Sequence, residues 1–95
     1  MKRLSVYILK CSDDSYYTGV TNNLTRRLSE HQHGRNPTSY TYSRRPVELM
    51  FYAEFTDFLC AIAKEKQIKR WSNAKKKALI EGRFDDLVNL AKKKF

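Results

Sequence analysis

Residues 4–21 of the chain read LSVYILKCSDDSYYTGVT. Leu4, Val6 and Ile8 alternate with their neighbours at the period of two that is typical of a β-strand. A cluster of turn-forming residues follows at 11–15, and residues 16–21 are rich in the tyrosine, threonine and valine that favour strands. The pattern therefore predicts a β-hairpin with a short loop at the start of the chain.

A helix and a third strand are predicted after this hairpin. Asn22-Asn23 is a helix N-cap signal and Gly34 a left-handed stop, so we expect a helix from residue 24 to about 33. The polar stretch 35–46, with its scattered tyrosines, predicts a loop that is long for a small domain. Residues 47–54 then alternate in polarity, which predicts a half-buried third strand.

The rest of the chain is predicted to be helical. We expect one helix over about 58–71, capped by Thr56-Asp57, and Ser72-Asn73 either interrupts this helix or caps the next one, over 74–81. A last amphipathic piece is expected at about 84–92. The predicted fold is a single α+β domain over residues 1–95 with element order β-β-α-β-α-α, in which helices flank a three-stranded antiparallel sheet.

The net charge is the outstanding feature of the composition. Nineteen basic and ten acidic residues among 95 give +9, which favours an anionic partner such as nucleic acid. No apolar run approaches the length of a membrane helix, and the N-terminus does not resemble a signal peptide. Cys11 and Cys60 are too few for a disulfide scaffold or a zinc site. We therefore expect a cytoplasmic protein with reduced thiols and no membrane partner, in which association with the nucleoid remains open.

Three features are not explained by the predicted fold alone. Gly19 lies inside a predicted strand, where glycine marks a bulge or a close approach of backbone or ligand. Glu65 falls on an apolar helical stripe, where a carboxylate needs a partner, either Lys69 four residues on or a metal ion. Arg27 and His31 share one helix face at i and i+4, and form either a phosphate-facing pair or an exposed surface pair.

The hairpin carries two motifs that resemble those of the GIY-YIG nuclease domain superfamily. Ser5-Val6-Tyr7 is similar to the first motif, with the tyrosine kept while serine and valine replace glycine and isoleucine. Tyr17-Thr18-Gly19 is similar to the second motif. The likeness covers about residues 4–80.

Later positions follow the order of the same family. Arg27 and His31 stand on the first helix and Glu65 on a later one, as the resemblance requires. The lysine-rich stretch 63–80 resembles the small stand-alone bacterial branch of the superfamily, known as UPF0213 or UvrC-like proteins.

The resemblance implies an endonuclease that hydrolyses DNA phosphodiesters in a setting such as repair or recombination, with one Mg²⁺ or Mn²⁺ ion and no small-molecule cofactor. Glu65 would hold the ion, since hard divalent cations take carboxylate oxygens. Arg27 would hold the phosphate oxygens where charge develops. Tyr7 would take a proton from the attacking water, helped by Tyr17 or His31, and the sequence leaves open which tyrosine is the base.

Two further positions are expected to matter for the same reaction. A side chain at Gly19 would crowd the phosphate against the sheet. Asn73 is a candidate for an asparagine found near the end of this domain in many members, and its role is left open.

The excess positive charge is concentrated around the predicted metal ligand. Residues 64–77 hold seven basic residues against the single acid Glu65. The residues expected to bind nucleic acid are Lys64, Lys66, Lys69, Arg70, Lys75, Lys76, Lys77, Arg44 and Arg45. This distribution suggests a phosphate backbone steered towards Glu65.

Two other functions fit the same residues. A DNA- or RNA-binding module would use the lysines without cutting, and an RNA-associated protein could also stack bases on the tyrosines of the 35–46 loop. We expect a monomer or weak dimer, in which a protein partner could help to position the DNA.

Overall fold

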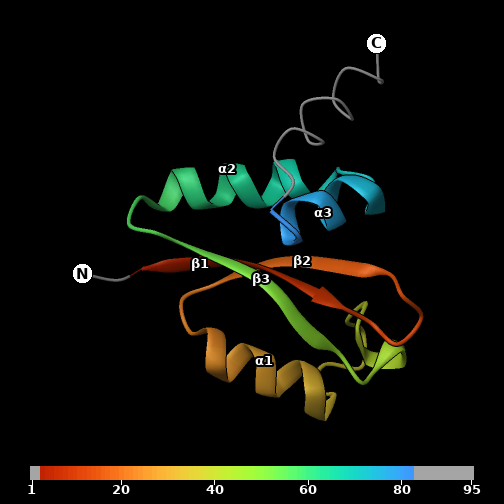
Figure 1. Cartoon of the computed structure of the whole chain (residues 1–95). Helices are drawn as coiled ribbons and strands as arrows, with labels where there is room; N and C mark the ends of the chain where they lie inside the picture. The colour runs from red at the N-terminus through yellow and green to blue at the C-terminus, as the bar shows by residue number, and fades with distance from the viewer. Residues whose placement is uncertain (1–2, 83–95) are drawn as a thin grey trace.

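The computed structural model describes residues 3–82, and these form an α+β domain (Figure 1). The strands β1 (Leu4–Lys10), β2 (Tyr16–Thr21) and β3 (Glu48–Phe55) make one antiparallel sheet in the order β2-β1-β3. Helix α1 (Leu24–His33) covers one face of this sheet, while α2 (Phe58–Lys69) and α3 (Asn73–Ile80) lie over the other (Figure 1). The predicted fold class and element order are therefore confirmed.

The β1–β2 hairpin forms where the sequence predicts it. The Asp13 carboxylate accepts hydrogen bonds from the backbone N–H and the hydroxyl of Ser15, while Asp14 takes the left-handed conformation (φ 66°) that closes the turn. The resulting register pairs Tyr7 with Gly19 and Leu9 with Tyr17. Because paired residues project from the same face, the tyrosines of both motifs point towards α1.

Polar caps set the limits of the helices. The side chains of Asn23, Asp57 and Ser72 each accept a hydrogen bond from the first turn of α1, α2 and α3 respectively. Gly34 ends α1 in the left-handed conformation, at φ 63°. The second helix ends at Lys69, two residues before the expected limit, because Ser72 caps a separate helix instead of interrupting a continuous one.

A β-bulge divides the apolar residues of the third strand between the two faces of the sheet. The β1–β3 register shifts between Ile8 and Leu9, which pair with Phe51 and Leu49, so that Met50 is an extra residue on β3. An extra residue reverses the alternation beyond it. Leu49 and the preceding Val47 therefore pack on the α1 side of the sheet, whereas Phe51 and Phe55 pack on the α2 side.

Two apolar clusters hold the layers together. Tyr7, Leu9, Cys11 and Val47 form the cluster under α1, which Leu24 and Leu28 complete. The cluster under α2 and α3 is built on four buried residues: Val6, Ile8, Ala61 and Ile68. The central strand β1 thus supplies alternate residues to both clusters, which fixes the direction in which Tyr7 points.

One predicted element cannot be compared. The amphipathic piece expected at 84–92 lies outside the described residues. Within residues 3–82, no helix has both the length and the apolar character that crossing a bilayer would require.

Candidate active site

Tyr7 lies in the middle of the central strand and is only 1% exposed. Its ring extends over Gly19, and a Cβ built on that glycine would overlap the Tyr7 Oη and lie 2.6 Å from Cζ. Gly19 pairs regularly with Tyr7, so it does not mark a bulge. The structure also revises the expectation that Gly19 makes room for a phosphate, since the phenol of Tyr7 itself occupies the space.

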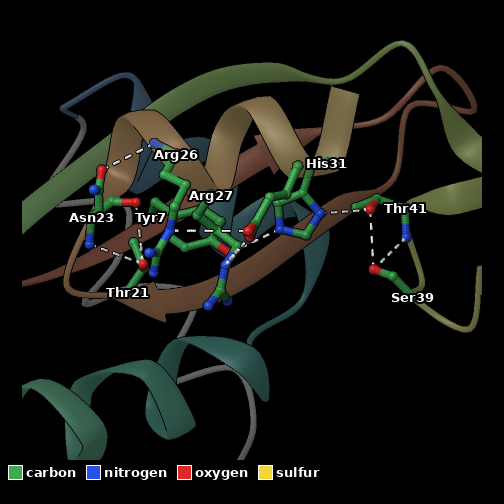
Figure 2. A network of polar contacts seen from close by, with 9 residues as sticks. Tyr7, Thr21, Asn23, Arg26, Arg27, His31, Ser39 and Thr41 are labelled. Atoms are coloured by element: carbon green, nitrogen blue, oxygen red, sulfur yellow. Dashed lines mark hydrogen bonds and ion pairs between the residues drawn. The ribbon is translucent and has the colours of Figure 1, made fainter. Parts of the chain in front are cut away.

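The Tyr7 phenol is hydrogen-bonded to His31 on α1. Tyr7 Oη lies 3.0 Å from His31 Nε2, and His31 Nδ1 lies 2.7 Å from Thr41 Oγ1. Thr41 Oγ1 is in turn 3.1 Å from Ser39 Oγ. Figure 2 shows this row of side chains running from the sheet to the 35–46 loop. The first helix and the loop therefore combine to orient the imidazole against the motif tyrosine.

Tyr17 stands beside the same pair. Its ring centroid lies 5.2 Å from that of His31 and 6.3 Å from that of Tyr7. On its outer side it stacks on Tyr40 at 6.0 Å. The two motif tyrosines thus lie close together, as the hairpin register requires.

Arg27 and His31 line one cleft of about 360 Å³, together with Tyr17 and residues of the 35–42 loop. Arg27 donates from Nε to Glu30 Oε1 at 3.1 Å, and its side chain is 39% exposed. Glu30 lines the cleft as well. The guanidinium is therefore held in place on the helix while part of it remains open to a ligand.

Burial and neighbouring charges raise the pKa of Tyr7 and lower the pKa of His31. The pKa of Tyr7 is raised to about 12, first by burial, then by Tyr17 and more weakly by Glu65, against the opposing charge and hydrogen bond of Arg27. The pKa of His31 is lowered, mainly by burial and then by the Arg27 charge. His31 is therefore neutral at neutral pH.

Glu65 approaches from the opposite face of the sheet, on α2. The residue is 8% exposed, and its carboxylate lies 3.4 Å from Lys69 Nζ. Lys69 Nζ is also 5.9 Å from the centroid of the Tyr17 ring. β2 is an edge strand, and the Tyr7 phenol interacts electrostatically both with Arg27 on α1 and with Glu65 on α2. Lys69 is thus one partner of Glu65, and a metal ion as the other stays a prediction.

The carboxylate of Glu65 suits a metal ion that is also coordinated by substrate, and not one that is coordinated by protein side chains alone. Among residues 3–82, no three His, Cys, Asp or Glu side chains gather as a metal cluster. Mg²⁺ commonly takes one or two carboxylates and fills its remaining positions with water and substrate phosphate. The single buried carboxylate of Glu65 fits that pattern.

The basic residues of α2 and α3 differ in accessibility. Lys64, Lys66, Lys69, Arg70 and Lys77 are exposed, and Lys75 Nζ lies 4.5 Å from the centroid of the Trp71 ring. Lys76, by contrast, is only 5% exposed, and its pKa is lowered by burial and by Lys69. The expected phosphate-binding role of Lys76 therefore does not match its position in the fold.

Arg44 and Arg45 brace the loop that carries Thr41. Arg44 binds Asp13 at 3.0 Å and lies 3.9 Å from the centroid of the Tyr40 ring. Arg45 donates to the Tyr42 carbonyl at 2.9 Å and lies over its ring. Both expected nucleic-acid ligands are thus engaged within the protein. Asn73 begins α3 beside Lys77 and is not among the residues that line the cleft near His31.

No sequence pattern predicted the contacts that Thr41, Ser39 and Glu30 make around His31 and Arg27. Thr41 and Ser39 lie in a loop with no periodic pattern, and only the fold brings them to His31. Glu30 was detectable in principle, because it stands three residues after Arg27 on the same helix face.

Most of the chain is similar to one known protein family. The GIY-YIG catalytic domain matches residues 3–78, which include every residue described around Tyr7. The chain belongs to the GIY-YIG family. This family belongs to a nuclease superfamily. The domain that carries Tyr7, Arg27 and Glu65 is therefore nuclease-like.

Relatives of this GIY-YIG chain include proteins of similar size. A UPF0213 protein of Syntrophus aciditrophicus is 48% identical over 82 residues, covering 85% of this chain and 93% of the relative. A UPF0213 protein of Natronomonas pharaonis is 43% identical over 75 residues, covering 79% and 87%.

Solved structures share the GIY-YIG fold described above. The solution NMR structure of a UPF0213 protein from Bacillus halodurans is 35% identical, with a TM-score of 0.55 and 83% of each chain covered. A protein from E. faecalis solved by the same method is 28% identical, with a TM-score of 0.61 and 88% of each chain covered. The similarity extends over most of the domain and is not limited to the motifs.

Proposed function

We propose that this GIY-YIG chain is a metal-dependent endonuclease that hydrolyses DNA phosphodiesters. The observation that carries the proposal is the meeting of Tyr7, His31 and Arg27 at the edge of β2, where the buried carboxylate of Glu65 approaches from the other face. A phosphoryl-transfer site needs a base, a cation for the phosphate oxygens and an anionic ligand for a metal. These side chains supply all three.

Tyr7 is the general base of the proposed reaction. Its ionised oxygen would accept the proton of the attacking water, and burial, which raises the pKa of Tyr7 to about 12, disfavours that ionised form. The neighbouring donors therefore have to favour its ionised form, and Arg27 already lowers the pKa against the effect of burial. Tyr17, whose ring lies 6.3 Å away, closes one side of the phenol and limits its contact with water.

Arg27 binds the phosphate. Glu30 fixes the guanidinium through Nε, which leaves its terminal nitrogens to hydrogen-bond two oxygens of a phosphate. Arg27 is therefore already oriented in the folded helix before the substrate binds, so binding costs less side-chain entropy.

Glu65 would hold the one Mg²⁺ or Mn²⁺ ion of the proposed enzyme. When bound, the ion would neutralise phosphate charge and stabilise the leaving oxygen. Lys69 Nζ, 3.4 Å from the carboxylate, balances the negative charge of Glu65 in the absence of an ion. We place the enzyme in the cytoplasm, with repair or recombination as its setting and DNA as its partner.

A non-catalytic DNA- or RNA-binding module is the second candidate. The exposed basic residues of α2 favour it, because their charge would attract a phosphate backbone whether or not Tyr7 reacts. Such a module binds nucleic acid with a steep dependence on salt and forms no Mg²⁺-dependent product.

A nicking assay separates the two functions. Supercoiled, branched and single-stranded DNA would be incubated with the wild-type protein, Glu65→Gln and the exposed-carboxylate control Glu48→Gln, with and without Mg²⁺. We expect Mg²⁺-dependent nicking in the wild type and the control, and a loss of about 10²–10⁴-fold in Glu65→Gln. Equal rates in the wild type and Glu65→Gln would reject the metal-dependent mechanism.

A further inference from the structure

Thr41 is the least conspicuous member of the site and one of its most buried residues. It is 1% exposed, although it lies in a loop between α1 and β3. Its hydroxyl lies 2.7 Å from His31 Nδ1 and 3.1 Å from Ser39 Oγ. A threonine hydroxyl has a single proton to donate. Which of the two neighbours receives that proton determines the state of His31.

The two distances around His31 indicate the same direction of donation. Hydrogen bonds from a hydroxyl are commonly near 2.7–2.8 Å, whereas those from a ring N–H are nearer 2.9–3.0 Å. The contact of 2.7 Å between Thr41 Oγ1 and Nδ1 therefore matches a hydroxyl donor. The contact of 3.0 Å between Nε2 and Tyr7 Oη matches an N–H donor. A neutral imidazole that accepts at Nδ1 must carry its proton on Nε2, so each assignment requires the other.

Ser39 is placed to complete this arrangement. Its oxygen accepts the backbone N–H of Thr41 at 3.4 Å, and its own proton can be donated to Thr41 Oγ1. If Thr41 accepts from Ser39, its remaining proton has His31 Nδ1 as an acceptor. Every proton of the row then points inward, from the loop towards Tyr7.

We propose that Thr41 is a positioning residue that holds neutral His31 as its Nε2–H tautomer, so that His31 donates a hydrogen bond to the Tyr7 oxygen. The consequence for catalysis rests on the proposed nuclease function. His31 keeps its proton throughout and stabilises Tyr7 as a phenolate, as does the hydrogen bond from Arg27. Because Nε2 donates, the Tyr7 proton is directed away from the imidazole, and a water molecule rather than His31 takes it when the phenolate forms. His31 is thereby assigned as a hydrogen-bond donor to Tyr7 and not as the base.

The tautomer can be measured without any enzymatic activity. Long-range ¹H–¹⁵N correlation spectra at neutral pH distinguish a protonated ring nitrogen from a bare one. We expect the wild-type protein to show a bare Nδ1 and a protonated Nε2 on His31. A bare Nε2 with a protonated Nδ1, or an averaged mixture of both forms, would overturn the assignment.

Variants of Thr41 test the cause. Thr41→Val removes the hydroxyl at nearly constant volume, and we expect the Nδ1 resonance to move towards that of an unbonded nitrogen. Thr41→Ser restores the donor and should return the resonance to its wild-type position, whereas the exposed control Thr38→Val should leave it unchanged. An Nδ1 resonance unaffected by Thr41→Val would refute the role of Thr41. If Thr41→Val fails to fold, Ser39→Ala provides the milder perturbation and should shift the same resonance.

The catalytic consequence has its own measurement. On DNA that the wild type nicks, we expect Thr41→Val to lower kcat about tenfold, which is the loss of one buried hydrogen bond, with DNA affinity unchanged within about twofold. Thr41→Ser should stay within about threefold of the wild type. A fall in affinity with kcat unchanged would contradict a positioning role. Absence of nicking by the wild-type protein would reject the proposed function, while the tautomer spectra would still decide the assignment of His31.

Discussion

The phenol of Tyr7 lies over the Cα of Gly19, its partner across the β1–β2 pair. A regular strand offers no other way for a buried tyrosine to reach the edge of the sheet, because any side chain on the paired residue would occupy the space of the ring. The two motifs on the hairpin are therefore one structural unit. In the proposed enzyme the tyrosine would supply the reactive oxygen, and the glycine leaves room for its ring.

Gly19→Ala should displace the Tyr7 ring. The added Cβ would lie 2.6 Å from Cζ, so we expect a loss of stability of about 1–3 kcal/mol and a disrupted Tyr7–His31 hydrogen bond. Urea unfolding measures the first effect and the His31 ring resonances the second. Gly82→Ala is the control, since a Cβ there meets no atom of residues 3–82 within 4 Å and alanine is strained only by the φ of +72°. It should cost about 1 kcal/mol without touching the site. A Gly19→Ala variant with unchanged His31 resonances would show that the ring is not displaced.

Removing the Tyr7 hydroxyl should abolish the chemistry and spare the fold. Tyr7→Phe keeps the ring in the cluster under α1, so we expect stability within about 1 kcal/mol of the wild type. The nicking rate should fall by about 10²–10⁴-fold, the usual contribution of a general base. Tyr52→Phe is the matched control, because Tyr52 pairs with Tyr7 on the other neighbouring strand but is 54% exposed. Comparable rates in the two variants would argue against Tyr7 as the base.

The lowered pKa of His31 predicts that acid weakens the fold. In the unfolded chain His31 binds a proton at the ordinary histidine pKa of about 6.5. In the folded state burial and the Arg27 charge disfavour the protonated form, and the Glu30 charge favours it more weakly. Since the unfolded state binds more protons, the free energy of unfolding should fall as the pH drops below about 6.5. Urea unfolding of the wild type, His31→Gln and the exposed control His33→Gln at about pH 7 and pH 5 checks this. We expect a smaller decline in His31→Gln alone, and an equal decline in all three proteins would rule out His31 as its source.

Local patterns predicted most of the fold because each acts over a few residues. Alternation located the hairpin, and capping residues such as Asn23 and Ser72 located the helix starts. The bulge at Met50 was not predictable in this way, since a register shift depends on the pairing of β3 with β1 and not on the polarity of β3 alone.

The site shows the same division. Tyr7, Arg27 and Glu65 were found because their residue types are unusual at their positions or match a family motif. Thr41 was not, since a threonine in a polar loop carries no signal until the loop folds back onto α1. Lys76 was misjudged for a related reason: a run of lysines does not reveal which member is turned into the protein.

Adjacent lysines on α3 should therefore behave differently in DNA binding. Lys77 is exposed, whereas Lys76 is 5% exposed and its lowered pKa reflects burial next to the charge of Lys69. The logarithm of DNA affinity falls with the logarithm of salt concentration by about 0.9 per phosphate contact. We expect Lys77→Met to reduce this slope by about one contact and Lys76→Met to leave it unchanged, because methionine retains much of the buried side chain. Fluorescence anisotropy with labelled DNA over a salt series measures both slopes. An equal reduction in the two variants would mean that Lys76 reaches the phosphates despite its burial, and the binding surface on α3 would have to be redrawn.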